Sequence, residues 1–464
     1  MKRVALSCLL ASLGGMAVWA IAASPDASNP KTASSGGAKI VAPAEDLIVH
    51  EWGTFTTFSG SDGVHLDFRP LAAAHSDLPD FVWDRASGSP QAVFSKARLR
   101  GKVRMETPVT YFYTDRERTI RASVEFPQGM LTEFYPPVES FSPPFDIKAA
   151  TTDGEKIGNS RLDWGKIKLI PAKAFLPTVA DETDGAWLQQ RVLENLCLPG
   201  NGHYAAARAT DSAFVLTNLK SKGPFSPGGR YLEKFLFYRG VGKFELPVQV
   251  EAGTDGEIRV HNRGTEALKS LFLVESTGNE QRMSAIPQVA AGQAAVMPRP
   301  VPVTDRQAAR DQMVTALVQE GLYEKEARAM VATWDDSWFL EEGTRVFYMV
   351  PRPVTDSLLP LKIEPQPKET VRVLVGRLEV MRASEEKRLV EVVRRSAAAR
   401  SVERQKQQET GVTPPELPVP EEIAKLGRLA EPALVRVELV SRDREVRDEA
   451  EYLLYLLRKL PKDL

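Results

Sequence analysis

Cysteine is almost missing from this chain of 464 residues, which contains only Cys8 and Cys197. Cys8 lies in an N-terminal segment that we expect to be removed, so the mature chain would keep Cys197 alone and form no internal disulfide. We interpret Cys197, in the string Leu-Cys-Leu, as a small buried apolar residue rather than a nucleophile. Stability is then expected to come from packing and not from covalent cross-links.

The chain also lacks an excess of charge of either sign. Its 60 Lys and Arg residues balance 61 Asp and Glu residues, which gives a formal net charge of -1. This balance provides no long-range field for nucleic acid or an anionic membrane surface, so neither is a predicted partner. The sequence further lacks a Gly-x-Ser-x-Gly elbow, a phosphate-binding loop and a dinucleotide fingerprint.

Long apolar runs are confined to the N-terminus. Two basic residues precede an apolar stretch over residues 4–22, and Ala20-Ile21-Ala22 offers the small residues that a signal peptidase reads. We therefore predict a signal peptide over residues 1–22 and a periplasmic or extracellular location. The alternative is an uncleaved anchor, which would be the chain's only membrane contact. Residues 23–44 are small, polar and rich in Pro and Gly, which is typical of a flexible linker.

Short apolar runs with a period of two indicate β-structure in the rest of the first half. In residues 119–126, apolar and polar side chains alternate, which is the pattern of a strand with one buried face. Gln128-Gly129 predicts a hairpin to the next strand, at residues 130–135. We therefore predict a mainly β fold of antiparallel β-sandwich domains, the first over residues 45–243. One helical pattern interrupts it at residues 185–196.

A second β-sandwich domain is predicted over residues 244–383. A strand that ends in Asn-x-Gly and is followed by a Leu-x-Leu strand resembles immunoglobulin-like domains in its pattern. Helical periodicity near residues 304–336, with Gly321 between two amphipathic runs, predicts a helical hairpin inserted in this domain. Strand patterns return at residues 344–381.

The C-terminal segment, residues 384–464, is helical in pattern throughout. We predict a charged helix over residues 384–409 and a stiff proline-rich link over residues 410–420. The helix pair predicted at residues 421–440 and 443–460 resembles a single HEAT repeat. Because one repeat cannot bury its own apolar face, we expect the pair to dock on the β-structure or on a partner.

The string from His50 to Thr56 is the most distinctive one in the chain. A zinc protease would need His-Glu-x-x-His on a helix, but residue 54 is threonine and the neighbouring residues favour a strand. Asp62 precedes a glycine in a predicted tight turn, which would bring His65 back toward His50. We therefore take His50, Asp62 and His65 as candidate ligands of a divalent metal, zinc or calcium, and predict no other cofactor. The alternative is a hydrogen-bonded histidine at the end of a strand.

Acidic residues on or near predicted strands are the other candidates for chemistry. Glu106 and Glu133, and also Glu125 and Asp163, offer the paired carboxylates of a glycoside hydrolase. Glu106 and Glu133, together with His50, are the candidate catalytic residues. Because Asp and Glu are common on the solvent-facing side of strands, the alternative is that they are ordinary surface residues.

The chain carries four specific strings, at residues 50–56, 104–109, 234–240 and 337–339. Together they resemble a group of uncharacterised exported bacterial proteins that have His-Glu-Trp-Gly-Thr-Phe near the mature N-terminus. The resemblance covers most of residues 46–381. The resemblance implies a shared fold and an envelope or extracellular setting. It assigns no activity and identifies no catalytic residues.

Three functions follow as hypotheses. The first is a non-catalytic envelope or secreted protein that binds a polysaccharide or a protein surface partner, because no catalytic motif is present. The second is a secreted hydrolase of carbohydrate or peptide, acting either with or without a divalent metal. The third is an assembly scaffold that acts through the C-terminal helices.

Overall fold

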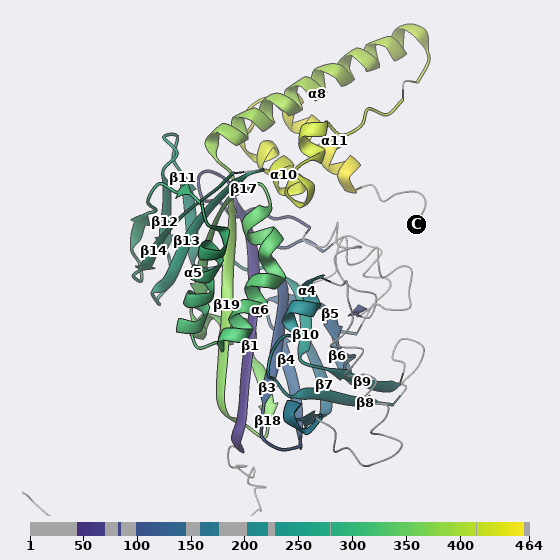
Figure 1. The fold of residues 1–464 in the computed structure, drawn as a ribbon. Coiled ribbons are helices and arrows are strands. Elements are labelled where there is room, and N and C mark those ends of the chain that lie inside the picture. The colour runs from purple at the N-terminus through teal and green to yellow at the C-terminus, as the bar shows by residue number, and fades with distance from the viewer. Residues whose placement is uncertain are drawn as a thin grey trace, which may run out of the picture. The chain divides into compact units, whose positions relative to one another are not determined.

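The computed structural model describes residues 44–69, 82–84, 99–144, 158–175, 202–220, 228–278, 280–413 and 415–458. These residues form three β-sheets and several helices, and strands account for the larger share (Figure 1). A mainly β fold with antiparallel sheets is therefore confirmed. Among the helices in these ranges, none combines the length and the apolar character needed to cross a membrane. The predicted signal peptide, nearly all of the predicted linker, the helix predicted at residues 185–196 and Cys197 lie outside the described residues.

The largest sheet has ten strands, and its two central strands are far apart in the sequence. β1 (Ala44–Ser59) and β19 (Pro367–Val380) run parallel, with Thr56 opposite Arg377. The other pairings found in this sheet are antiparallel. The order across it is β16 (Val301–Pro302), β14 (Glu280–Val289), β13 (Leu268–Thr277), β17 (Gly343–Val350), β19, β1, β3 (Val103–Tyr113), β10 (Leu236–Gly242), β5 (Gly129–Tyr135) and β2 (Trp83–Asp84).

Two smaller sheets complete the β-structure. One runs in the order β18 (Leu361–Glu364), β4 (Arg118–Phe126), β7 (Ser160–Ile170), β8 (Phe214–Leu219) and β9 (Gly229–Glu233), with β6 (Ser140–Ser142) also paired to β7. The other consists of β11 (Val248–Ala252), β12 (Ile258–Asn262) and β15 (Ala294–Val296). The alternation predicted for residues 119–126 is confirmed in β4, where the apolar residues are buried and Arg121 and Glu125 are exposed.

The central sheet is covered on both faces, because successive side chains of a strand point to opposite sides. On β1, Leu47, Val49 and Phe55 belong to a core that also contains residues of both smaller sheets. Trp52 belongs to a second core, which is built with the helices of residues 306–340. We call these the sheet-covered face and the helix-covered face of the central sheet.

A helical hairpin lies on the helix-covered face, as the sequence predicts. It consists of α5 (Arg306–Gln319) and α6 (Glu324–Asp335), and a π-helical turn, η2 (Asp336–Leu340), continues α6. The side chain of Asp305 accepts hydrogen bonds from the backbone N–H groups that begin α5, at 2.8 and 3.1 Å. The shorter helical elements are η1 (Ala172–Phe175), α4 (Gly202–Ala207) and α7 (Arg352–Leu358).

The C-terminal segment is helical and has its own apolar core. It comprises α8 (Ala383–Thr410), α9 (Glu421–Ala424), η3 (Gly427–Leu429), α10 (Ala430–Val440) and α11 (Arg444–Arg458). The helix predicted at residues 421–440 is therefore broken. Gly427, the first residue of η3, has a φ of 53°, a left-handed conformation that separates α9 from α10.

The hairpin predicted at Gln128-Gly129 is wrong. β4 pairs with β7 and β18 in the six-stranded sheet, whereas β5 pairs with β10 and β2 in the central sheet. The link therefore carries the chain from one sheet to another. The ring of Phe126 lies where a side chain on Gly129 would be, since a Cβ there would come within 2.1 Å of it.

The predicted boundary at residue 243 falls between strands that share one sheet. β1, β3, β5 and β10 lie before this residue, and β13, β14, β17 and β19 lie after it. By contacts, residues 42–464 form one compact unit.

Candidate functional site

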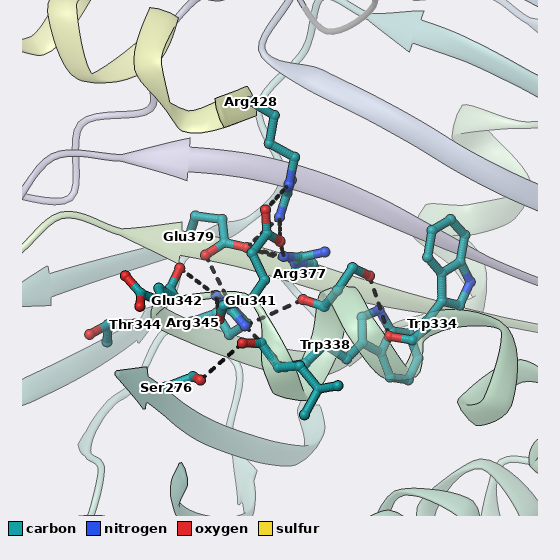
Figure 2. A network of polar contacts seen from close by, with 12 residues as sticks. Ser276, Trp334, Trp338, Glu341, Glu342, Thr344, Arg345, Arg377, Glu379 and Arg428 are labelled. Carbon is teal, nitrogen blue, oxygen red and sulfur yellow. Dashed lines mark hydrogen bonds and ion pairs between the residues drawn. The ribbon is translucent and has the colours of Figure 1, made fainter. Parts of the chain in front are cut away.

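A buried ionic network lies on the helix-covered face of the central sheet (Figure 2). Arg345 comes from β17, and Arg377 and Glu379 come from β19. Nε of Arg377 donates to Glu379 at 2.7 Å, and its Nη2 donates to Glu341 at 2.7 Å. Nε of Arg345 donates to the other oxygen of Glu379 at 3.2 Å. The two strands thereby place both guanidinium groups on the same carboxylate.

The C-terminal segment is joined to this network by Arg428, which belongs to η3. Its Nε donates to Glu341 at 2.6 Å, and its Nη2 donates to Glu379 at 3.0 Å. Arg345 also donates to backbone carbonyls at the end of the π-helical turn, those of Trp338 at 3.2 Å and Glu341 at 2.7 Å. The network therefore ties strands β17 and β19, the π-helical turn and the C-terminal segment together.

The network keeps its carboxylates ionised. Burial raises the pKa of the Glu341 carboxyl, but Arg428 and Arg377 outweigh this and lower it from 4.5 to about 2. For Glu379 burial again opposes ionisation, and the guanidinium groups of Arg345 and Arg377 hold its pKa below the ordinary value. Burial lowers the pKa of Arg345. The carboxylates are thus acceptors fixed by arginines and are poorly suited to carry protons at neutral pH.

A cavity of about 540 Å³ lies next to the network, between the end of the central sheet and the C-terminal segment. We call it the junction cavity. Its apolar lining comes from Phe58, Val380, Met381, Leu389, Leu426, Leu429, Pro432 and Ala433. Glu379 lines the cavity as well and so connects it to the ionic network.

Charged groups of both signs surround this apolar lining. Arg382 donates to Glu275 and, at 3.1 Å, to the hydroxyl of Thr344. Arg388 and Glu342 are exposed and have no ion-pair partner within the described part of the chain. The cavity thus combines an aliphatic interior with one cation and one anion that are free to contact a ligand.

His50, a candidate for both catalysis and metal binding, lies on the helix-covered face far from this cavity. Its Nδ1 is 2.7 Å from a carboxylate oxygen of Glu326 in α6, and the histidine is 1% exposed. The same carboxylate accepts from the hydroxyl of Tyr113 at 2.6 Å and from the backbone N–H of Tyr323 at 2.8 Å. These contacts correspond to a hydrogen-bonded histidine that anchors α6 to β1.

Asp62 and His65 lie beyond the other end of β1. His65 pairs with Ser59, nine residues along the strand from His50, which corresponds to roughly 30 Å. Asp62 stands in the predicted tight turn, where Gly63 has a φ of 76°, and it accepts from Arg436 of α10 at 3.1 Å. The structure therefore does not bring His50 together with the other two candidate ligands. Among the residues described, no group of three His, Cys, Asp or Glu side chains is placed to hold a metal.

Glu106 lies on β3 and Glu133 on β5, and β10 lies between these two strands in the central sheet. Each is buried beside an arginine: Glu106 is 3.2 Å from Arg104, and Glu133 is 2.8 Å from Arg239. Neither is a surface residue. Glu125 and Asp163 lie on β4 and β7 of the six-stranded sheet, where both contact Arg161.

Sequence reasoning missed the ionic network and the junction cavity. A signal was present in β19, whose apolar run is interrupted by Arg372, Arg377 and Glu379, all of them buried. Charged residues that face inward from a central strand are rare unless they are paired. Their partners, however, lie on other elements that no local pattern connects to β19.

Comparisons with known proteins add little. No family model matches the chain, and no curated protein matches it. Two solved structures of the yeast delta-COP-I mu-homology domain, one of them complexed with a Dsl1 WxWxV peptide, align with it at 7% and 6% identity. Each alignment covers 74% of this chain and 100% of the domain, with a TM-score of 0.25.

Proposed function

We propose that this chain is a non-catalytic binding protein whose junction cavity holds an aliphatic segment of a protein partner. The observation that carries the proposal is the cavity itself. Its volume of about 540 Å³ lies within the range of pockets that bind small ligands or the side chains of a peptide, and its lining is mostly apolar.

Binding is favoured over catalysis because the acidic side chains near the cavity and at the predicted sites are held by arginines. Glu379 contacts three guanidinium groups, and Glu106 and Glu133 each contact one. A general acid or base needs a pKa near the working pH, whereas the pKa values of Glu341 and Glu379 are held below the ordinary value by their arginine partners.

A protein partner is favoured over a polysaccharide. Sugar rings bind to exposed aromatic faces, and the lining of the junction cavity contains one aromatic residue, Phe58, which is buried. Aliphatic residues such as Leu389, Leu426 and Leu429 suit the side chains of a peptide. Arg388 and Glu342 would then contact charged groups on either side of that apolar segment.

The setting and the finer architecture are part of the same proposal. We propose that the chain is exported and acts in the periplasm or outside the cell, which is supported by the N-terminal pattern of basic, apolar and small residues. We also propose that the β layers form sandwiches, the second of them immunoglobulin-like. This is supported by the core that residues of all three sheets share.

Selection from a displayed random-peptide library, followed by calorimetry with the selected peptides, tests the proposal. We expect peptides with two or more aliphatic residues, and we expect Leu429→Arg to abolish their binding by placing a charge in the cavity. Leu439→Arg is the matched control, because Leu439 is exposed on α10 and does not line the cavity. Binding to oligosaccharides on a glycan array, with no peptide selected, would contradict the proposal.

A further inference from the structure

Buried hydrogen-bond donors without partners occur on β1 and β19, beside one residue of the ionic network. The hydroxyls of Thr54 and Thr56 and Nη1 of Arg377 are buried and have no hydrogen-bond partner. The residues are 0%, 0% and 1% exposed. Buried polar groups in folded proteins are nearly always paired, so three unpaired groups in one place require an explanation.

The three residues occupy adjacent positions on one face of the central sheet. Thr56 of β1 is opposite Arg377 of β19, and residues opposite each other in a sheet point to the same face. Thr54 is two residues from Thr56 and therefore faces the same side. This is the helix-covered face, since Trp52, two residues earlier, and Val375, two residues before Arg377, belong to the core built with the helices.

A fourth unpaired donor comes from the π-helical turn on the same face of the sheet. The ring of Trp338 packs on Phe347 at 5.2 Å, and Phe347 is opposite Arg377 in the next strand. The indole Nε1 of Trp338 is buried and also has no hydrogen-bond partner. An indole N–H and a guanidinium N–H can only donate, and each threonine hydroxyl can also donate, so all four groups can offer a donor to a bound anion.

The net charge of the ionic network also favours a bound anion. Arg345, Arg377 and Arg428 supply three positive charges, and Glu341 and Glu379 supply two negative ones (Figure 2). The pair nearest to Thr54 and Thr56 on the other side, Arg104 and Glu106, is neutral as a whole. These five side chains thus carry one excess positive charge, and Arg345 and Arg377, at most 1% exposed, lie in the buried part of the network, where an excess charge is costly.

We infer that Thr54, Thr56 and Arg377 form an internal site for one small monovalent anion, chloride being the simplest. The two hydroxyls and Nη1 of Arg377 would donate to it, and its charge would balance the excess guanidinium. A water molecule would satisfy some of the donors but would leave the charge uncompensated. The site is separate from the junction cavity, which none of the three residues lines.

Anomalous diffraction from crystals grown in sodium bromide locates such an anion directly. We expect one bromide peak within hydrogen-bonding distance of Nη1 of Arg377 and Oγ1 of Thr56. A peak with the density and distances of ordered water, and no anomalous signal, would overturn the inference.

Thermal unfolding of the purified chain provides the second test. At constant ionic strength, with gluconate replacing chloride, we expect the Tm to rise by roughly 2–4 °C over a hundredfold increase in chloride, because a ligand of the native state stabilises it by mass action. Thr56→Val, which keeps the shape and removes the hydroxyl, should abolish at least half of this rise. Thr57→Val is the matched control, since Thr57 is equally buried on the opposite face of the same strand, and it should keep the full rise.

The inference is wrong if wild type and Thr56→Val depend equally on chloride, or if neither depends on it. The peptide experiments on the junction cavity are unaffected by either result, so the two proposals fail independently.

Discussion

At the scale of single residues, Glu341 connects stability to acidity. Its pKa is about 2 in the folded protein and 4.5 ordinarily, so the stability it contributes is complete above pH 4.5. That contribution is lost as the pH falls from 4.5 toward 2, because the unfolded chain then binds a proton more readily than the folded one. We expect the free energy of unfolding, measured with urea across this range, to fall less steeply in Glu341→Gln than in wild type.

The control for this measurement is Glu445→Gln, on an exposed position of α11. It should reproduce the steep acid loss of the wild type. An identical slope in Glu341→Gln would mean that the ion pairs of Glu341 contribute nothing to folding.

The sequence predicts the conformation and burial of a residue well where these depend on its near neighbours in the chain. The tight turn at Asp62-Gly63 follows from the positive φ that glycine tolerates, and the alternation along β4 follows from one buried face. The partners of His50 and Glu106 could not be predicted. Glu326 lies 276 residues from His50, and no local pattern states which helix will cover that part of β1.

At the scale of elements, Arg428 holds the C-terminal segment against the central sheet through Glu341 and Glu379. Arg428→Ala should lower the free energy of unfolding by about 2 kcal/mol or more, since it removes the ion pairs and hydrogen bonds that join η3 to Glu341 and Glu379. Compared with wild type, the rate of backbone hydrogen exchange should increase more in α9, α10 and α11 than in β1 or β19. Both effects are measurable by urea unfolding and mass spectrometry.

Arg444→Ala provides the comparison for this variant. Arg444 is exposed on α11 and lies 3.6 Å from Asp448, one turn away. Its loss should change stability by no more than about 0.5 kcal/mol. Equal effects of the two substitutions would show that the C-terminal segment is held by its apolar contacts alone.

Element types were predictable, and element pairings less so. The periodicity that predicts α5, α6 and α8 is a local property, and all three helices form close to the predicted ranges. The link between β4 and β5 has the length of a hairpin, but the two strands belong to different sheets. Because β5 is buried on nearly all of its length, it fits a strand inside the central sheet and not the end of a half-exposed hairpin.

At the scale of the whole molecule, the parallel pairing of β1 with β19 makes the β-structure depend on both halves of the chain. A fragment of residues 45–243 would contain β1 without β19, and one edge of its apolar central strand would be unpaired. We expect this fragment to lack cooperative unfolding and dispersed NMR signals. A fragment of residues 45–382, which contains all the strands of the three sheets, should retain both.

A cooperative fold for residues 45–243 would instead support the domain boundary that the sequence suggests. The composition of the sequence around residue 243 does not indicate that strands pair across this boundary. Strands of a shared sheet have the same apolar pattern as strands of separate sheets. The contact between residues 44–59 and 367–380 is a property of topology, which local sequence patterns do not encode.

The same pair of strands also determines how the protein would respond to mechanical force. Since β1 and β19 point the same way, pulling the start of β1 away from the end of β19 stretches the hydrogen bonds between them all at once instead of opening them one by one. Arrangements that break in this collective manner resist high force. A chain stretched between its two ends would therefore be expected to yield last at its central pair of strands.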